Sequence, residues 1–128
     1  MIDVVAAYIR KNGTVLICQR GTQKARPLKW EFPGGKVEAG ETKAEALTRE
    51  CQEELRIELA IGQELADVIY DYPDITVHLT LLDATIQNGF PIKTEHNDLQ
   101  WVSPEQFEQY DFCPADQKMI SNMKIHKP

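Results

Sequence analysis

The sequence predicts one domain of the α/β (α+β) class, spanning residues 1–128, in which helices cover a mixed β-sheet. Short apolar runs rich in β-branched residues alternate with a few helical segments, an order typical of such a sheet. The chain has 128 residues, of which 42% are hydrophobic, so it can bury one core but is too short for two ordinary domains. It contains no internal repeat or low-complexity segment.

The chain is expected to open with a β-hairpin. Residues 4–9 and 14–18 are apolar, β-prone runs, and the Asn12-Gly13 pair between them favours a tight hairpin turn. Residues 21–29 then form a polar connection. In the following Pro33-Gly34-Gly35 segment, the two glycines predict a turn or a close approach of the backbone to a neighbour.

A helix is predicted to begin at Thr42, after a short extended piece at residues 36–38. Thr42 and Glu45 have the spacing of a capping box, in which the hydroxyl and the carboxylate each satisfy a backbone donor at the helix start. The helical period then predicts one apolar stripe along this helix. Its members are Ala44, Leu47, Cys51 and Leu55.

Three acids, Glu50, Glu53 and Glu54, border that stripe when the helix advances by about 100° per residue. They repel one another at i, i+3 and i, i+4 spacing, so a cation is expected between them. Oxygen donors without histidine or thiolate partners suit Mg²⁺, with Mn²⁺ as the alternative, rather than zinc. The other interpretation is an ordinary acidic face exposed to solvent.

The second half of the chain predicts another hairpin, a loop and two helices. Residues 64–72 and 75–86 alternate as strands do and are joined through Pro73-Asp74. Residues 87–97 form a loop, and residues 99–102 form a short strand. The two helices begin at Ser103-Pro104-Glu105, with the serine as N-cap, and after Pro114, running towards Lys124.

The net charge of −6 argues against binding to duplex nucleic acid. Five of the fourteen Lys and Arg residues nevertheless lie between Arg20 and Lys36, next to the acidic helix. This local positive charge suits a small polyphosphate ligand. Taken individually, Lys24 and Lys29 also fit a solvated loop.

The three cysteines, Cys18, Cys51 and Cys113, are scattered and lack CxxC spacing, which argues against a disulfide framework and against a zinc site. The N-terminus lacks the features of a signal peptide, and no apolar run approaches membrane-spanning length. We therefore expect a soluble, cytoplasmic protein with reduced thiols and no membrane partner, either a monomer or a homodimer.

One unit of 23 residues joins the glycines to the acidic helix. It reads Gly35-x5-Glu41-x7-Arg49-Glu50-Cys51-Gln52-Glu53-Glu54-Leu55-Arg56-Ile57. This resembles the signature of the Nudix hydrolases, G-x5-E-x7-R-E-U-x-E-E-x-G-U, in which U is a bulky apolar residue. The resemblance implies an αβα sandwich.

Two positions depart from that signature. Cys51 stands where Ile, Leu or Val is usual, a mild change because a buried thiol behaves as a small apolar group. Arg56 stands where glycine is usual. If Arg56 adopts the left-handed conformation that glycine favours at a helix end, the cost is about 1 to 2 kcal/mol.

The resemblance extends over nearly the whole chain. Further segments look like the MutT branch of the family: residues 30–36, Tyr72-Pro73-Asp74, the spacing from Glu95 to Trp101, and Pro114-Ala115-Asp116. That branch cleaves nucleoside triphosphates to a monophosphate and pyrophosphate, so the resemblance implies a Mg²⁺-dependent pyrophosphohydrolase.

Carried over by position, the resemblance assigns the residues of the reacting end of the site. The implied metal ligands are the Gly34 carbonyl, Glu50, Glu53, Glu54 and Glu95. The implied catalytic residues are Glu53, Arg49, Glu50 and Glu95. Arg49 would orient Glu50 and Glu41, although its spacing also allows simple pairing with Glu45 or Glu53. Glu95 would bind metal or activate water, whereas a loop glutamate is otherwise a solvated charge.

The resemblance also implies the substrate contacts. Arg20 and Lys36 would contact phosphate, Phe32 would pack against the base, and Asp116 would face its edge. Asp116 replaces the asparagine of guanine-sanitising MutT, and an ionised carboxylate only accepts hydrogen bonds. This mechanism gives His78 and His96 no role, so both are expected to be structural or solvated.

The predicted function is hydrolysis of oxidised or noncanonical nucleoside triphosphates such as 8-oxo-dGTP, as in nucleotide-pool sanitation and DNA repair. The first alternative is hydrolysis of CTP or a modified cytidine triphosphate. An alternative of another class is a Nudix-type module that binds nucleotide without cleaving it.

Overall fold

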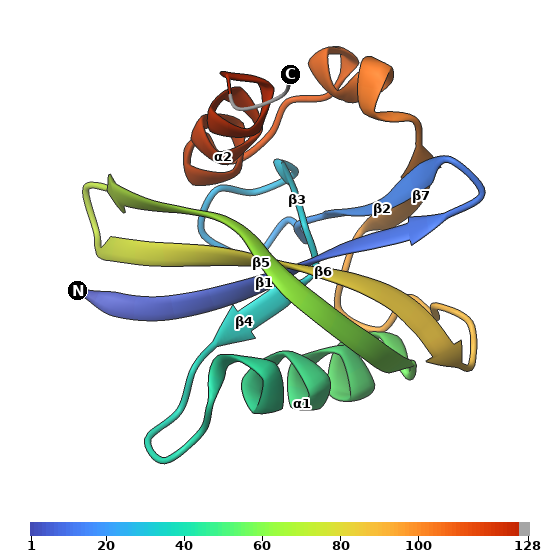
Figure 1. The fold of residues 1–128 in the computed structure, drawn as a ribbon. Helices are drawn as coiled ribbons and strands as arrows, with labels where there is room; N and C mark the ends of the chain where they lie inside the picture. Colours follow the sequence, from blue (N-terminus) through green and yellow to red (C-terminus); the bar gives the residue numbers. More distant parts are fainter. Residues whose placement is uncertain (126–128) are drawn as a thin grey trace.

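The central strand of the sheet is β1 (Ile2–Lys11), which runs parallel to β6 (Thr76–Asn88). It also pairs antiparallel with β2 (Thr14–Gln19) and β4 (Gly34–Lys36). The structure is a computed structural model that describes residues 1–125, and Figure 1 shows its sheet between two helical layers. The remaining elements are β3 (Trp30–Glu31), α1 (Lys43–Leu55), β5 (Glu58–Asp71), β7 (Asp98–Val102), the 3₁₀ helix η1 (Pro104–Gln109) and α2 (Pro114–Ile125).

Because β1 and β6 are parallel while the other pairs are antiparallel, the seven-stranded sheet is mixed. Its order is β3-β2-β1-β6-β5, with β4 paired to β1 and β7 paired to β2. The first hairpin forms as predicted, and Asn12 and Gly13 both have positive φ at its turn. The second hairpin, β5–β6, also forms through Pro73-Asp74.

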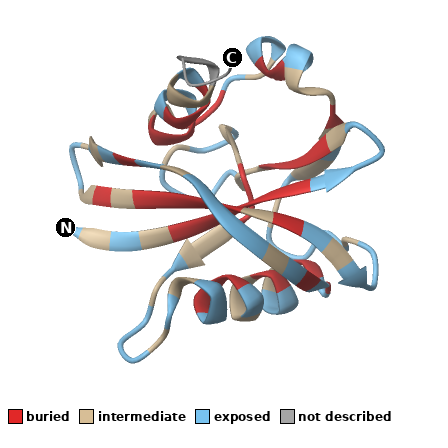
Figure 2. Ribbon diagram, viewed as in Figure 1, coloured by how far each residue is buried: buried red, intermediate tan, exposed pale blue. Residues whose placement is uncertain are grey.

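The centre of the sheet is buried on both faces, whereas the edge strand β5 is largely exposed, as Figure 2 shows. Residues 5–9 of β1 are all buried and alternate between two cores. Val5, Ala7 and Ile9 pack in the core beneath α1, whereas Ala6 and Tyr8 pack in the core that contains η1 and α2 residues. This arrangement confirms the predicted αβα sandwich.

Helix α1 begins with the predicted capping box. Thr42 Oγ1 accepts a hydrogen bond from Glu45 N at 3.1 Å, and Glu45 Oε1 accepts one from Thr42 N at 2.9 Å. The buried stripe differs from the prediction at one position, because Ala44 is exposed and Ala46 is buried in its place. Leu47, Cys51 and Leu55 are buried as expected.

The end of α1 has the conformation that the signature requires. Arg56 lies in the left-handed region, at φ 60° and ψ 36°, and its N–H donates to the carbonyls of Cys51 and Gln52. An arginine therefore occupies a conformation that glycine adopts at lower cost.

Gly34 and Gly35 do not form a turn. They lie in β4, and the predicted extended piece at residues 36–38 therefore begins two residues earlier. The close approach was predicted correctly, since a Cβ at Gly34 would overlap the carbonyl of Val5 on β1. These glycines are needed for proximity rather than for positive φ.

Other helix and strand boundaries differ from the predicted ones. β5 begins at Glu58 rather than at residue 64, because register shifts near Gly62 interrupt the alternation expected of a strand. β6 runs over residues 76–88 instead of 75–86. The helix after Ser103 is a single 3₁₀ segment, in which Gln106 Oε1 accepts from both the N and the Oγ of Ser103.

His78 was expected to be structural or solvated, and it has a structural role. Its Nδ1 lies 3.1 Å from Asp3 Oδ1 and its Nε2 lies 2.7 Å from Asp67 Oδ2, so it links β1, β6 and β5. The hydrogen bond to Asp67, together with the one to Asp3, raises the pKa of His78.

The three cysteines are unpaired and buried. Burial raises the pKa of the Cys51 thiol to about 12 and raises that of the Cys18 thiol well above its usual value. Across residues 1–125, none of the helices combines the length and apolar character needed to cross a membrane.

Replacing Arg56 with glycine should stabilise the protein. Arg56→Gly removes the Cβ strain at φ 60° and should raise the free energy of unfolding by about 1 kcal/mol, after the entropy that glycine adds to the unfolded chain. Urea unfolding followed by circular dichroism measures this change. A lower midpoint for the variant would mean that the arginine side chain makes contacts outweighing the strain.

Candidate functional site

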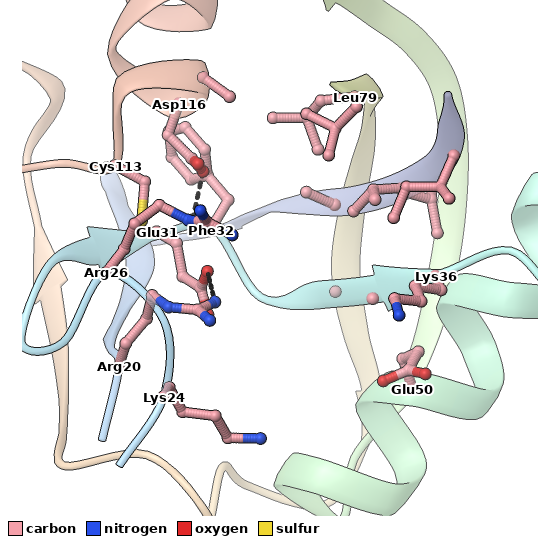
Figure 3. Close-up of a pocket in the computed structure, with 18 of the residues that line it drawn as sticks. Arg20, Lys24, Arg26, Glu31, Phe32, Lys36, Glu50, Leu79, Cys113 and Asp116 are labelled. Atoms are coloured by element: carbon pink, nitrogen blue, oxygen red, sulfur yellow. Dashed lines mark hydrogen bonds and ion pairs between the residues drawn. The ribbon is translucent and has the colours of Figure 1, made fainter. Parts of the chain in front are cut away.

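A cavity of about 550 Å³ lies beside β4, between the start of α2 and the acidic face of α1. Figure 3 shows Glu50 and Lys36 at one end and Phe32, Asp116 and Cys113 at the other. One end is therefore charged, and the other combines an aromatic ring with a buried carboxyl group.

The cavity brings together eight of the ten predicted site residues. They are Arg20, Phe32, Gly34, Lys36, Glu50, Glu54, Glu95 and Asp116. The other two stand outside its lining. Arg49 lies behind Glu50 and binds it, and the Glu53 side chain is 60% exposed.

Arg49 organises the charged end. Its Nε and Nη2 donate to both oxygens of Glu41 at 2.8 and 2.9 Å, and its Nη1 donates to Glu50 Oε1 at 2.7 Å. Nη2 also donates to the Lys36 carbonyl on β4 at 3.1 Å. The hydrogen bonds from Arg49 lower the pKa of Glu41 to about 2, so this carboxylate stays ionised.

These contacts decide between the two readings of Arg49. The side chain orients Glu41 and Glu50, as the resemblance implied, and approaches Glu53 only to 3.7 Å. Glu45 is engaged in the helix cap. A bidentate arginine pair of this kind fixes geometry as well as charge.

Gly35 provides the space that Glu50 occupies. A Cβ at Gly35 would overlap the Glu50 carboxyl group. The missing side chain thus lets α1 bring Glu50 against β4, where it faces the cavity.

At this end of the cavity, Glu54 has a raised pKa. Its side chain is 23% exposed, and burial together with the neighbouring Glu50 raises its pKa to about 8. Two carboxyl groups thus stand close together and repel each other when both are ionised. Such a pair, with all-oxygen donors, fits a divalent ion of the Mg²⁺ type.

The predicted ligands do not form a finished coordination shell. Within residues 1–125, no three His, Cys, Asp or Glu side chains are grouped so that they could hold a metal ion. The Glu53 side chain is 60% exposed, with Oε2 3.7 Å from Arg49 Nη1, and the Glu95 side chain is 59% exposed, 4.0 Å from Lys24 Nζ.

Arg20 is already engaged within the protein. Its Nη1 donates to Glu31 Oε1 at 2.9 Å, and its Nε donates to the Ala25 carbonyl at 2.6 Å. Glu31, which the sequence reasoning missed, neutralises the guanidinium that was predicted to contact phosphate. An acid directly before Phe32 was the available signal.

At the opposite end, Asp116 is buried and accepts a hydrogen bond from Phe32 N at 3.0 Å. Burial, together with the charge of Glu31, raises the pKa of Asp116 to about 8. The raised pKa favours a protonated acid, which donates as well as accepts, over the ionised carboxylate that was expected. Phe32 packs against Tyr8 and Phe107, which makes it part of the core as well as a cavity residue.

His96, which was expected to be structural or solvated, has its side chain buried in the wall of the cavity. Its side chain is only 6% exposed and lines the cavity, with Nε2 3.7 Å from Glu54 and 3.9 Å from Glu31. Burial lowers its pKa, so the ring is neutral. Its position next to Glu95 in the sequence was the only signal.

Comparison with known proteins agrees with this geometry. The NUDIX domain model matches residues 4–122. The CTP pyrophosphohydrolase of Escherichia coli (strain K12) is 40% identical over 116 residues, which cover 91% of this chain and 86% of that protein. The 8-oxo-dGTP diphosphatase of the same strain is 32% identical over 126 residues, covering 96% of each chain.

Solved structures show the same likeness. The crystal structure of the MutT protein from Methanosarcina mazei Go1 aligns with a TM-score of 0.86 and 25% identity, covering 97% of this chain and 93% of that one. The family model spans most of the chain. Both relatives align with this chain over nearly their whole length. The chain therefore belongs to the Nudix family of hydrolases.

Proposed function

We propose that this protein is a Mg²⁺-dependent pyrophosphohydrolase of the MutT type, which cleaves a nucleoside triphosphate to the monophosphate and pyrophosphate. The observation that carries this proposal is the division of one cavity into a carboxylate end and an end that combines an aromatic ring with a buried carboxyl group. A nucleoside triphosphate has the same division. Its phosphates require cations, and its base requires an aromatic wall with a hydrogen-bonding group.

At the carboxylate end, Glu50, Glu54 and the Gly34 carbonyl would hold the metal, and Glu53 and Glu95 would turn to complete the set. Magnesium, or manganese in its place, would neutralise phosphate charge and lower the pKa of the attacking water. The raised pKa of Glu54 supports this assignment, because a cation would relieve the repulsion between Glu54 and Glu50.

The protein's own residues would align the reaction. Water would attack the β-phosphorus. The bond from that phosphorus to the oxygen that bridges it to the α-phosphorus would break, and the monophosphate would leave. An ionised Glu53 or Glu95 would accept the proton of the water. Arg49 would keep Glu50 in place, and Lys36 would contact phosphate oxygens through charge-assisted hydrogen bonds.

For the base, we propose that Asp116 acts as a protonated acid near neutral pH. It could then donate to the O6 of an oxidised guanine while accepting from N1–H, the pairing that an asparagine would offer. Phe32 would pack beside the base. This supports 8-oxo-dGTP as a substrate, and so a role in sanitising the nucleotide pool in the cytoplasm.

CTP or a modified cytidine triphosphate is the second candidate. It is favoured by the 40% identity to the Escherichia coli enzyme named CTP pyrophosphohydrolase. The same Asp116 could accept from the exocyclic amine of cytosine, the hydrogen-bond donor of that base. The choice between the two substrates is therefore open to direct measurement.

Pyrophosphate release with Mg²⁺ tests the function. The panel should contain ordinary and oxidised nucleoside triphosphates, nucleotide sugars and dinucleoside polyphosphates. A preference for 8-oxo-dGTP supports sanitation, and a preference for CTP supports the second candidate. Absence of turnover throughout would favour the non-catalytic nucleotide-binding module.

Glu53→Gln should lower kcat by a factor of about 100 or more, because it removes a carboxylate that binds metal or accepts a proton. The side chain is 60% exposed, so the thermal unfolding midpoint should not change. Glu58→Gln on the exposed start of β5 is the matched control. Full activity of Glu53→Gln would contradict its assignment.

Gly35→Ala should reduce kcat by about tenfold or more while the fold is kept, since a loss of positioning of this order follows small displacements at a reacting centre. The added Cβ would push the Glu50 carboxylate away from the cavity. The control is Gly62→Ala, where a Cβ would meet Asp83 only at an ordinary contact distance of 3.5 Å. Equal kcat for the two variants would show that Glu50 does not need its present position.

The affinity for 8-oxo-dGTP should fall as the pH rises through about 8, because Asp116 then ionises and stops donating. The measurement is KM between pH 6.5 and 9.5 for the wild type and for Asp116→Asn, whose amide donates at every pH. The ratio of the two KM values cancels the ionisation of the substrate. A ratio that stays constant with pH would contradict a protonated Asp116.

A further inference from the structure

Arg26 joins two loops that are far apart in the sequence. It lies in the connection between β2 and β3, and its Nη1 donates to Asp74 Oδ1 in the β5–β6 turn at 3.0 Å. Its guanidinium also stacks over the Tyr72 ring, with Cζ 3.9 Å from the ring centre. Arg26, Tyr72 and Asp74 all line the cavity, so this contact forms part of its wall.

Both ends of this contact are fixed to the body of the protein. The Tyr72 hydroxyl accepts a hydrogen bond from Ala115 N at the start of α2, at 2.9 Å, and Tyr72 closes its own turn through Ile75. The Arg26 loop is fixed at its base by Arg20, which donates to the carbonyls of Ala25 and Lys29. A single side chain thus spans two anchored segments.

Two residues of this loop have an unfavourable backbone conformation. Arg26 and Leu28 have φ values of 53° and 61°, a conformation that side chains with a Cβ rarely adopt. Such strain persists where neighbouring contacts compensate it. The ion pair and the stacked ring are contacts of that kind, and the Arg26 side chain is only 23% exposed.

Arg26 belongs to the base end of the cavity. Figure 3 shows it beside Cys113, on the side of Phe32 and Asp116, and across the cavity from Lys36 and Glu50. The contact is therefore positioned to act on the part of a ligand that lies farthest from the carboxylates.

We propose that Arg26 is a positioning residue for the nucleobase: its pairing with Asp74 and Tyr72 holds the β2–β3 loop across the base end of the cavity. This inference rests on the proposed function and adds a residue to it. Opening the contact would leave phosphate binding intact but would let the base leave more easily. Arg26 and Asp74 would then act together on KM and not on the chemical step.

The test compares Arg26→Gln, Asp74→Asn and the charge-swapped double variant R26D/D74R. The substrates are 8-oxo-dGTP and CTP, and inorganic tripolyphosphate serves as a competitor without a base. Arg26→Gln should raise KM about fivefold, the size expected from an ion pair together with a stacked guanidinium. Asp74→Asn, which keeps the stacking, should raise it about twofold, and neither variant should change kcat much. The inhibition constant of tripolyphosphate should not change, and the charge swap should recover most of the lost affinity.

Lys29 and Asp111 provide the matched control. Lys29 Nζ donates to Asp111 Oδ2 at 2.6 Å from the same loop, and neither residue lines the cavity. Lys29→Gln and Asp111→Asn should leave KM as it is in the wild type. If they raise KM as much as Arg26→Gln does, the contact stabilises the loop only in a general way and the proposal is overturned.

Two further outcomes are decisive. An effect of Arg26→Gln without one of Asp74→Asn, and without recovery in the swap, would show direct contact between Arg26 and the base and would overturn the pairing. Dissociation constants for CTP and 8-oxo-dGTP, measured by calorimetry, separate this proposal from the catalytic one. If the wild type binds these nucleotides but cleaves none, the proposed function fails, while weaker binding by both single variants still supports the contact.

Discussion

The rest of the site depends on the hydrogen bonds that Arg49 donates to Glu41 and Glu50. One guanidinium ties together the loop before α1, the helix itself and, through the Lys36 carbonyl, strand β4. Together with the capping box at Thr42, these hydrogen bonds fix the positions of the three segments relative to one another. The acids of the helix can then face a cavity whose floor is the central strand.

The cavity holds more negative charge than its surroundings neutralise. Arg20 compensates Glu31, whereas the pKa values of Glu54 and Asp116 rise to about 8. Both values rise because burial disfavours the charged carboxylate and a neighbouring glutamate adds to the effect. The proposed function would use the two groups differently. A cation would relieve the repulsion between Glu54 and Glu50, whereas a protonated Asp116 would offer a donor as well as an acceptor.

Features set by neighbours in the sequence could be predicted, and features set by tertiary contacts could not. The capping box at Thr42 and the hairpin turn at Asn12-Gly13 are local, and they formed as expected. The conformation of Arg56 was left open by the sequence, and it is left-handed. The αβα layers followed from the resemblance to a known family. In contrast, Glu31 meets Arg20 and His96 meets Glu54 only after distant strands and loops assemble. For Gly34-Gly35, the sequence allowed a turn or a close approach; it could not choose between them, because the neighbours on β1 and α1 are distant in the chain.

The burial of the three cysteines has a consequence for chemical durability. Oxidants attack thiolates that are exposed. Burial here suppresses the thiolate form of Cys51 and Cys18, and Cys113 is also buried although it lines the cavity. The three thiols should therefore react slowly with peroxide, which would suit the proposed action on oxidised nucleotides.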